Sequence, residues 1–229
     1  MKFQQPDKSV WPDSDPRKSM DEFDPVFFRD HYNKRMTVEQ PALTKEQCGL
    51  SFFDAIFVNA VETLPAHKSM LDIGCGNARV SLNMVSRSIV DSLIGIDISD
   101  VMVERATETA INLGISDKVV FSRTMIEDFI PERQFDVIYA TEVIEHIFNL
   151  RQALGQISSW LTDDGIFGGI TPYLNTCDSK PVHFHYFTTG DLYVLLYDFF
   201  EDVNVLKIDV NGKEEYHLLF QCMKPKRSV

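Results

Sequence analysis

The sequence has few cysteines and no long apolar run, and both shortages limit the kind of protein that it encodes. Its 229 residues include four cysteines, and none of them forms a CxxC pair. Scattered thiols of this kind are typical of a reduced, cytoplasmic protein. No apolar stretch approaches the ~18–20 residues of a membrane-spanning helix, and the polar, acidic N-terminus lacks an apolar signal region. We therefore expect a cytoplasmic protein with no membrane partner.

Basic residues are also scarce. The chain has 22 Lys and Arg against 34 Asp and Glu, a formal net charge of −12, and only a short basic tail at Lys224–Arg227. Because nonspecific nucleic-acid binding needs clustered Lys and Arg, a large RNA or DNA partner is disfavoured, although a local basic patch is not excluded. A hydrophobic content of 44% is ordinary for a soluble globular protein. The sequence leaves open whether the protein is a monomer or a homodimer.

The chain divides into three parts. Residues 1–25, rich in Pro, Asp, Ser and Lys, predict a flexible arm. Residues 26–66 predict a helical cap, whose second helix follows Thr44 and ends at Pro65. Residues 67–224 predict the main domain, because short apolar strands alternate there with helices of about a dozen residues. This alternation predicts an α/β fold with a doubly wound, mostly parallel sheet.

The main domain's elements follow from its apolar pattern and its turns. We expect strands near residues 69–73, 93–98, 118–123, 135–140 and 165–170, and helices near 77–88, 100–113 and 149–161. Asp163-Asp164-Gly165 should make the turn after the third of these helices. The segments Val203–Ile208 and Tyr216–Cys222, joined through Asn211-Gly212, predict an antiparallel hairpin at one edge of the sheet.

The most informative segment is Leu71–Val80, LDIGCGNARV. It predicts a buried strand that carries Asp72 and then a turn formed by Gly74, Cys75 and Gly76. Glycines let a backbone turn sharply and let a ligand approach closely. Asn77 is a good candidate to cap the helix that follows. The first strand–turn–helix of a doubly wound sheet is where such folds bind nucleotides.

A second acid strengthens this interpretation. Ser92–Ser99, SLIGIDIS, predicts the next strand, with Asp97 near its end. An acid there can accept hydrogen bonds from both ribose hydroxyls of a nucleoside. A dinucleotide site would need a third glycine for close helix packing, but that position holds the bulky Arg79. Asp72, directly before the turn, also suits a ligand with a positive charge.

At these residues the chain resembles the class I S-adenosylmethionine-dependent methyltransferases, whose first motif looks like LDIGCGNAR followed by an acid in GIDIS. The resemblance covers roughly Met70–Thr171. It implies S-adenosylmethionine as cofactor and a Rossmann-like, seven-stranded sheet with a reversed last strand. It also implies that Asp72 lies near the methionine amino end and Asp97 at the ribose. Further cofactor-binding candidates are the turn residues Gly74, Cys75 and Gly76, with Ile98 and Met102 beside the adenine ring, and Thr141. Glu127 and Asp128 both qualify to accept from the adenine amino group; the residues do not choose between them, although the family pattern leans towards Asp128.

The segment after the fourth strand, Thr141–His146, is the second most informative. Its residues follow the carboxyl end of a strand, where open α/β sheets place their ligands. If a helix starts at residue 142, then Glu142, Glu145 and His146 share one face. Such a group suits general acid–base work by His146. It equally suits a divalent metal site with oxygen and nitrogen ligands.

The loop after the fifth strand can lie over the same pocket. It carries Tyr173 and then His183-Phe184-His185-Tyr186, and two histidines at i and i+2 on an extended stretch should face the same way. Substrate-binding candidates are Glu142, Tyr173, His183 and Tyr186. Catalytic base candidates are His146 and His185. We predict no metal; the alternative is a metal held by Glu142, Glu145, His146 and His185.

EVIEH followed by HFHYF resembles two groups of methyltransferases. One comprises the small-RNA 3′-terminal 2′-O-methyltransferases, in which two glutamates and two histidines hold a metal. The other comprises small-molecule enzymes, including the ubiquinone-pathway O-methyltransferases. The acidic chain favours a small-molecule acceptor over RNA. We expect the methyl group to go to an oxygen or a nitrogen of that molecule. Methylation of an RNA end and a non-catalytic, cofactor-binding subunit stay as alternatives.

Overall fold

The structure, a computed structural model, describes residues 25–39, 41–45, 47–65, 68–174, 183–209 and 215–227. Apart from Pro25, the arm predicted over residues 1–25 lies outside them, as does the predicted Asn211-Gly212 turn. The helices are α1 (Pro25–Glu39), α2 (Phe52–Glu62), α3 (Arg79–Ser86), α4 (Asp100–Leu113), α5 (Leu150–Trp160) and α6 (Thr189–Tyr197), with 3-10 turns η3 (Ser116–Lys118) and η4 (Ile144–His146). The strands are β1 (Ser69–Ile73), β2 (Ser92–Asp97), β3 (Val119–Arg123), β4 (Phe135–Thr141), β5 (Leu161–Pro172), β6 (Phe200–Asp209) and β7 (Tyr216–Pro225).

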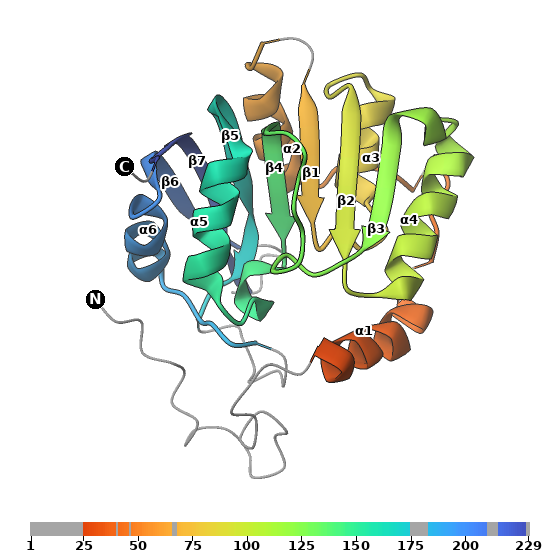
Figure 1. Cartoon of the computed structure of the whole chain (residues 1–229), viewed down its shortest axis with the longest axis horizontal. Coiled ribbons are helices and arrows are strands. Elements are labelled where there is room, and N and C mark those ends of the chain that lie inside the picture. The colour runs from red at the N-terminus through yellow and green to blue at the C-terminus, as the bar shows by residue number, and fades with distance from the viewer. Residues whose placement is uncertain are drawn as a thin grey trace.

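The strands form one seven-stranded sheet in the order β3-β2-β1-β4-β5-β7-β6 (Figure 1). β1 to β5 pair in parallel, and β7 runs antiparallel to both of its neighbours. This confirms the predicted mostly parallel sheet and its antiparallel edge hairpin. The order reverses between β1 and β4, and ligands of open α/β sheets bind at such a reversal, beyond the carboxyl ends of the strands.

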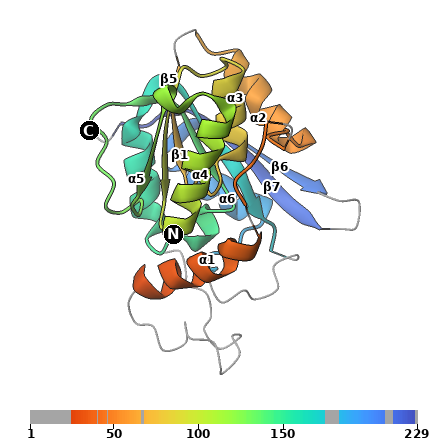
Figure 2. The ribbon, with the colours of Figure 1, turned by 90° about the vertical axis from the view of Figure 1, so that its right-hand side faces the viewer.

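Two hydrophobic layers enclose the sheet because side chains along a buried strand point alternately to its two faces. Leu71 and Ile73 of β1 pack in a cluster with residues of α5 and α6. Met70 points to the opposite face, where Phe57 of α2 and Ala106 of α4 belong to its cluster. Figure 2 shows α5 and the α2–α3 pair on opposite sides of the sheet, with α1 lying across one end of it.

Three local predictions differ from the structure. Helix α3 starts at Arg79, not at residue 77, because Ala78 adopts a left-handed conformation with φ 56° and is itself the N-cap. Asn77 instead donates a hydrogen bond to the carbonyl of Pro41. The predicted turn at residues 163–165 is part of β5, and the register shifts there: Phe135 pairs with Leu161, whereas Val137 pairs with Ile166. Between these two pairs β5 therefore runs through five residues while β4 runs through two, so β5 is irregular here, as at a β-bulge.

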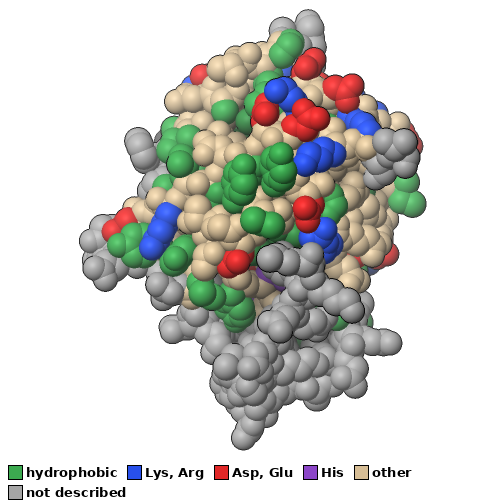
Figure 3. Space-filling model, turned by 90° about the vertical axis from the view of Figure 1, so that its left-hand side faces the viewer, with side chains coloured by type: hydrophobic (Ala, Val, Ile, Leu, Met, Phe, Trp, Pro, Cys, Tyr) green, Lys and Arg blue, Asp and Glu red, His purple; other side chains and the backbone are tan. Residues whose placement is uncertain are grey.

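The surface seen in Figure 3, over the α6 side of the molecule, mixes acidic, basic and apolar side chains. Helix α6 itself exposes three large apolar side chains, Tyr193, Val194 and Tyr197. Acidic side chains lie among the basic ones in this view, so the face shown carries no continuous positive surface of the kind that binds nucleic acid. Among the described residues, no helix combines the length and the apolar character needed to cross a membrane.

Gly169 of β5 provides a test of the sheet packing. A Cβ at this position would lie 1.8 Å from the carbonyl oxygen of Ala140 on the neighbouring strand. We therefore expect Gly169→Ala to lower the free energy of unfolding by about 1–3 kcal/mol, as overpacked cores do. Urea unfolding measures this. The matched control is Gly190→Ala in α6, where the nearest atom lies at 3.9 Å; equal losses in both variants would contradict the packing described.

Candidate active site

A cavity of about 450 Å³ opens at the carboxyl ends of β1, β2 and β4. Its walls come from the segments after these strands and from α1, which contributes Phe28 and Tyr32. Helix α1 is fixed to the start of α4, because Asn33 accepts a hydrogen bond of 2.6 Å from the hydroxyl of Ser99, the N-cap of α4. The predicted cap therefore contributes α1 to the site, while α2 packs against the sheet.

The turn after β1 brings backbone close to the cavity. Gly74 and Gly76 have φ values of 63° and 54°, the left-handed region that glycine adopts without strain. A Cβ on Gly74 would lie 2.4 Å from Cγ2 of Val143, so only glycine fits between these two segments. Cys75, between them, donates its backbone N–H to Ile96 at 3.0 Å. Burial and then the neighbouring carboxylates raise the pKa of its thiol, so it is no thiolate nucleophile.

Asp72 and Asp97 both line the cavity from neighbouring strands. Asp72 is 5% exposed, and one of its oxygens accepts a 2.5 Å hydrogen bond from the hydroxyl of Ser81. Burial raises the pKa of Asp72 to about 7; the bond from Ser81 opposes this rise, and the charge of Asp97 adds to it. A cation beside Asp72 would offset the cost of burying its charge.

Asp97 is held by backbone N–H groups. It accepts hydrogen bonds from Gly76 at 2.9 Å and from Ser99 at 2.8 Å. Burial raises the pKa of its carboxyl, and these backbone bonds oppose the rise. Each oxygen of an ionised carboxylate has more than one acceptor site, so both oxygens can still accept hydroxyl donors from a ligand.

The two acids after β3 lie in different surroundings, and Asp128, towards which the resemblance leans, is not on the cavity wall. Glu127 lines the cavity, and burial raises the pKa of its carboxyl. Asp128 is exposed and lies outside the cavity wall. Ile98 and Met102 line the same region, Met102 being 2% exposed. Thr141, at the end of β4, is also on the wall.

The helix predicted from residue 142 does not form. Glu142 has φ 56°, which is incompatible with a right-handed helix, and only the short turn η4 follows it. The side chain of Glu142 lines the cavity and pairs with His217 Nε2 of β7 at 3.2 Å. Hydrogen bonding to Glu142 raises the pKa of His217 against the opposing effect of burial. Glu142, Glu145 and His146 therefore do not share one face.

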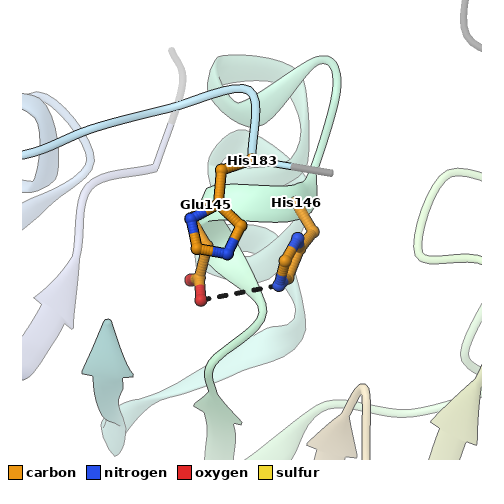
Figure 4. Close-up of side chains that lie close together, drawn as sticks. All are labelled: Glu145, His146 and His183. Atoms are coloured by element: carbon orange, nitrogen blue, oxygen red, sulfur yellow. Dashed lines mark ion pairs between the residues drawn. The ribbon is translucent and has the colours of Figure 1, made fainter. Parts of the chain in front are cut away.

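Glu145, His146 and His183 lie together instead (Figure 4). One ligand atom of each lies within 4.8 Å of the others, and His146 and His183 line the cavity. His185 points elsewhere: its Nε2–H donates to the carbonyl of Ile147 at 2.7 Å, and burial lowers its pKa. The two histidines of the loop thus face different ways, contrary to the i, i+2 expectation. The reason is that the backbone N–H groups of Phe184 and His185 both donate to the carbonyl of Glu145.

Two aromatic candidates lie outside the cavity wall. Tyr173 sits at the end of β5, where the ammonium of Lys207 lies 4.0 Å from its ring centre and 3.9 Å from that of Tyr216. Tyr186 packs near His183, with ring centres 6.1 Å apart. Neither tyrosine belongs to the residues that line the cavity.

Known proteins resemble this chain across the region just described. A family model described as a methyltransferase domain matches residues 64–210. The chain belongs to this family. Its fold is that of the class I methyltransferases, and S-adenosylmethionine is the methyl donor of the family.

Curated relatives match this methyltransferase over shorter regions. The 27-O-demethylrifamycin SV methyltransferase of Amycolatopsis mediterranei (strain S699) is 38% identical over 85 residues, which are 37% of this chain and 31% of that protein. The mitochondrial ubiquinone biosynthesis O-methyltransferase of Candida albicans is 34% identical over 80 residues, 34% of this chain and 24% of that protein. The chain thus spans a third or less of the length of these two relatives.

Solved structures resemble it in fold. The 1,6-didemethyltoxoflavin-N1-methyltransferase of Burkholderia thailandensis, solved with bound 1,6-didemethyltoxoflavin and S-adenosylhomocysteine, superposes with a TM-score of 0.65 at 16% identity, covering 88% of this chain and 86% of that one. The N-methyltransferase NodS of Bradyrhizobium japonicum WM9, solved with S-adenosylhomocysteine, gives a TM-score of 0.63 at 17% identity, covering 85% and 100%.

Sequence reasoning missed a buried network behind the glycine turn of the methyltransferase. Arg79, considered only as a replacement for a glycine, pairs with the buried Asp54 of α2 at 2.8 Å. The hydroxyl of Tyr139 on β4 also donates to Asp54, at 3.3 Å. Asp54 is the N3 residue of a capping box whose N-cap is Ser51, a spacing that the sequence displays. His217 carried no comparable signal, because its pairing with Glu142 depends on the register between β5 and β7.

The pKa of Asp72 predicts how cofactor binding depends on pH. As the pH falls below about 7, Asp72 becomes neutral and no longer attracts the amino group of a methionine-like ligand. We expect the affinity for S-adenosylhomocysteine to fall by about tenfold for each pH unit below that value. Isothermal titration calorimetry between about pH 5.5 and 7.5 measures this.

Asp72→Asn is the matched variant. It should bind the ligand about 30-fold or more weakly at neutral pH and lose the pH dependence, since a buried charge partner is gone. The contribution of Asp72 to the stability of the ligand-free protein has the opposite sign: its raised pKa favours the folded state while it is protonated, and this contribution is lost as the pH rises from about 4 through 7. Equal pH profiles in both proteins would contradict the role of Asp72.

Proposed function

We propose that this methyltransferase transfers the methyl group of S-adenosylmethionine to a hydroxyl or amino group of a small molecule. The observation that carries the proposal is one cavity lined by two chemically different pairs of residues. Asp72 and Asp97 form one pair, and His146 and His183 form the other. The first pair suits a cationic nucleoside, and the histidines suit an acceptor that must lose a proton.

We assign the cofactor contacts as follows. Asp72 faces the amino end of the methionine part, and Asp97 accepts the ribose hydroxyls, while the glycine turn allows close approach. Glu127 accepts from the adenine amino group, in preference to the exposed Asp128, and Ile98 and Met102 pack beside the ring. Support for these assignments is that all of these residues except Asp128 line the cavity.

Methyl transfer from a sulfonium is an in-line displacement. A lone pair of the acceptor attacks the methyl carbon, the carbon–sulfur bond breaks, and its electron pair stays on sulfur. Because the leaving group is already activated, the protein has mainly to align acceptor and methyl. We propose that His146 assists loss of the acceptor's proton. His185, the other candidate, does not reach the cavity wall.

The size and covering of the cavity support a small acceptor. About 450 Å³ lies within the usual range of small-molecule sites. Aromatic side chains cover it: the rings of Tyr32 and His146 meet edge to face at 5.7 Å, and Phe28 packs on Phe184 at 5.2 Å. The names of the relatives include both O- and N-methyltransferases, so we propose oxygen or nitrogen as the acceptor atom.

We further propose that α1 acts as the cap over a catalytic domain of residues 67–224. Its contacts with the cavity and with α4 support this division. The cytoplasmic location and the monomeric or homodimeric state stay predictions.

The variant His146→Ala tests the catalytic proposal. Formation of S-adenosylhomocysteine should be measured at saturating cofactor with a panel of phenols and amines, and the most active acceptor then used for comparison. We expect turnover to fall by about 10²- to 10⁴-fold, the usual contribution of acid–base assistance.

The control is His185→Gln, which keeps a donor for the Ile147 carbonyl and should retain turnover. Unchanged turnover in His146→Ala would remove His146 from the mechanism. Cofactor binding without product from any acceptor would instead favour the non-catalytic alternative.

A further inference from the structure

Glu145, His146 and His183 form a cluster with more buried and contacting groups than a single proton acceptor would need. Glu145 and His183 are 1% and 3% exposed, so a carboxylate and an imidazole are buried side by side. The rings of His146 and His183 meet edge to face, with centres 4.6 Å apart. In Figure 4 the three side chains point toward one another from η4 and from the segment after residue 182.

Both parts of the cluster are held by hydrogen bonds outside it. Oε2 of Glu145 accepts a 2.9 Å hydrogen bond from the hydroxyl of Thr171 on β5, while Oε1 lies 3.6 Å from Nε2 of His146. The backbone N–H groups of Phe184 and His185 donate to the Glu145 carbonyl at 2.8 and 3.2 Å, which fixes the His183 segment against η4. A ligand carboxylate oriented by a neighbouring hydroxyl is the arrangement that supports a metal centre.

The donor set itself selects a class of ion. Two imidazole nitrogens and one carboxylate oxygen suit divalent transition metals such as zinc, manganese, iron or cobalt, whereas calcium and magnesium prefer oxygen ligands alone. Two donor atoms that each lie about 2.1 Å from one ion are at most about 4.2 Å apart. The donor atoms of this cluster all lie within 4.8 Å of one another, so they need to move only slightly closer to bind one ion. His146, with 18% of its side chain exposed, is the ligand most able to move.

The open side of the cluster faces the proposed acceptor. His146 and His183 line the cavity, whereas Glu145 lies behind them. Three protein ligands leave coordination positions free, as in catalytic metal sites. A divalent cation there would lower the pKa of a hydroxyl placed next to it.

We propose that Glu145, His146 and His183 bind a divalent transition-metal ion, and that the acceptor is a small molecule with an ionisable hydroxyl. The inference rests on the proposed methyl transfer. In this arrangement His146 assists proton loss as a ligand of the ion, not as the proton acceptor. The O–H bond of the acceptor breaks and its proton passes to solvent; the oxygen's electron pair then forms the bond to the methyl carbon as the carbon–sulfur bond breaks. Glu142 is not part of this set, because it pairs with His217.

Cobalt(II) chloride is the probe for the test. The wild-type protein, freed of metal by chelation and dialysis, is titrated with the ion while calorimetry and the visible absorption spectrum are recorded. We expect one strong site per chain with a d–d spectrum typical of nitrogen and oxygen ligands. Glu145→Gln and His183→Ala should each weaken binding by at least about 10²-fold, more than loss of a supporting group does.

His185→Gln is the matched control, since it changes a histidine two residues from His183 that points away from the cluster. It should bind cobalt as the wild type does. S-adenosylhomocysteine binding is measured for every variant in parallel, and its retention shows that the variant is folded. The nearly isosteric Glu145→Gln keeps the test valid if His183→Ala does not fold.

The outcomes separate the two proposals. Wild-type protein that binds S-adenosylhomocysteine but no stoichiometric cobalt overturns the metal site and leaves the proposed methyl transfer standing. Equal cobalt binding by wild type and Glu145→Gln overturns the ligand assignment. Absence of S-adenosylhomocysteine binding by folded wild-type protein overturns the proposed function itself.

Discussion

The burial of two carboxylates at the ends of neighbouring parallel strands is the constraint on which the rest of this structure depends. Asp72 is buried and Asp97 is half-buried, and desolvation destabilises their charged forms unless donors or a cation face them. The protein supplies part of this compensation itself, through Ser81 and the N–H groups of Gly76 and Ser99. A cationic adenosyl ligand would supply the remainder.

The surrounding backbone is arranged around this pair. The left-handed glycines let the β1–α3 segment pass directly against Val143, and Arg79 then ties the start of α3 to Asp54 of α2. Helix α2, which packs on the sheet, thus also holds Arg79, a residue of the cavity wall. Helix α1 is held by Asn33 to the start of α4, which places the aromatic side chains of Phe28 and Tyr32 on the wall of the cavity.

Much of this could be predicted from the sequence, because it depends on local signals. Alternating apolar strands and helices predicted the parallel sheet, and two glycines followed by an acid one βα unit later predicted residues that the structure brings together on the cavity wall. The residues after β4 and β5 were harder to predict. The left-handed backbone of Glu142 prevents the expected helix, and the orientation of His183 and His185 is set by two N–H groups that reach the carbonyl of Glu145, far away in sequence. The choice between Glu127 and Asp128 also depended on how the chain leaves β3, which residue spacing does not encode.

The central claim is that the paired carboxylates recognise an adenosyl sulfonium rather than a dinucleotide. Calorimetric titration of the folded protein with S-adenosylhomocysteine and, separately, with NAD⁺ tests it most directly, with Asp97→Asn as the variant. We expect one site per chain for S-adenosylhomocysteine, weakened in the variant, and no heat of binding for NAD⁺. Binding of NAD⁺ together with none of S-adenosylhomocysteine would contradict it.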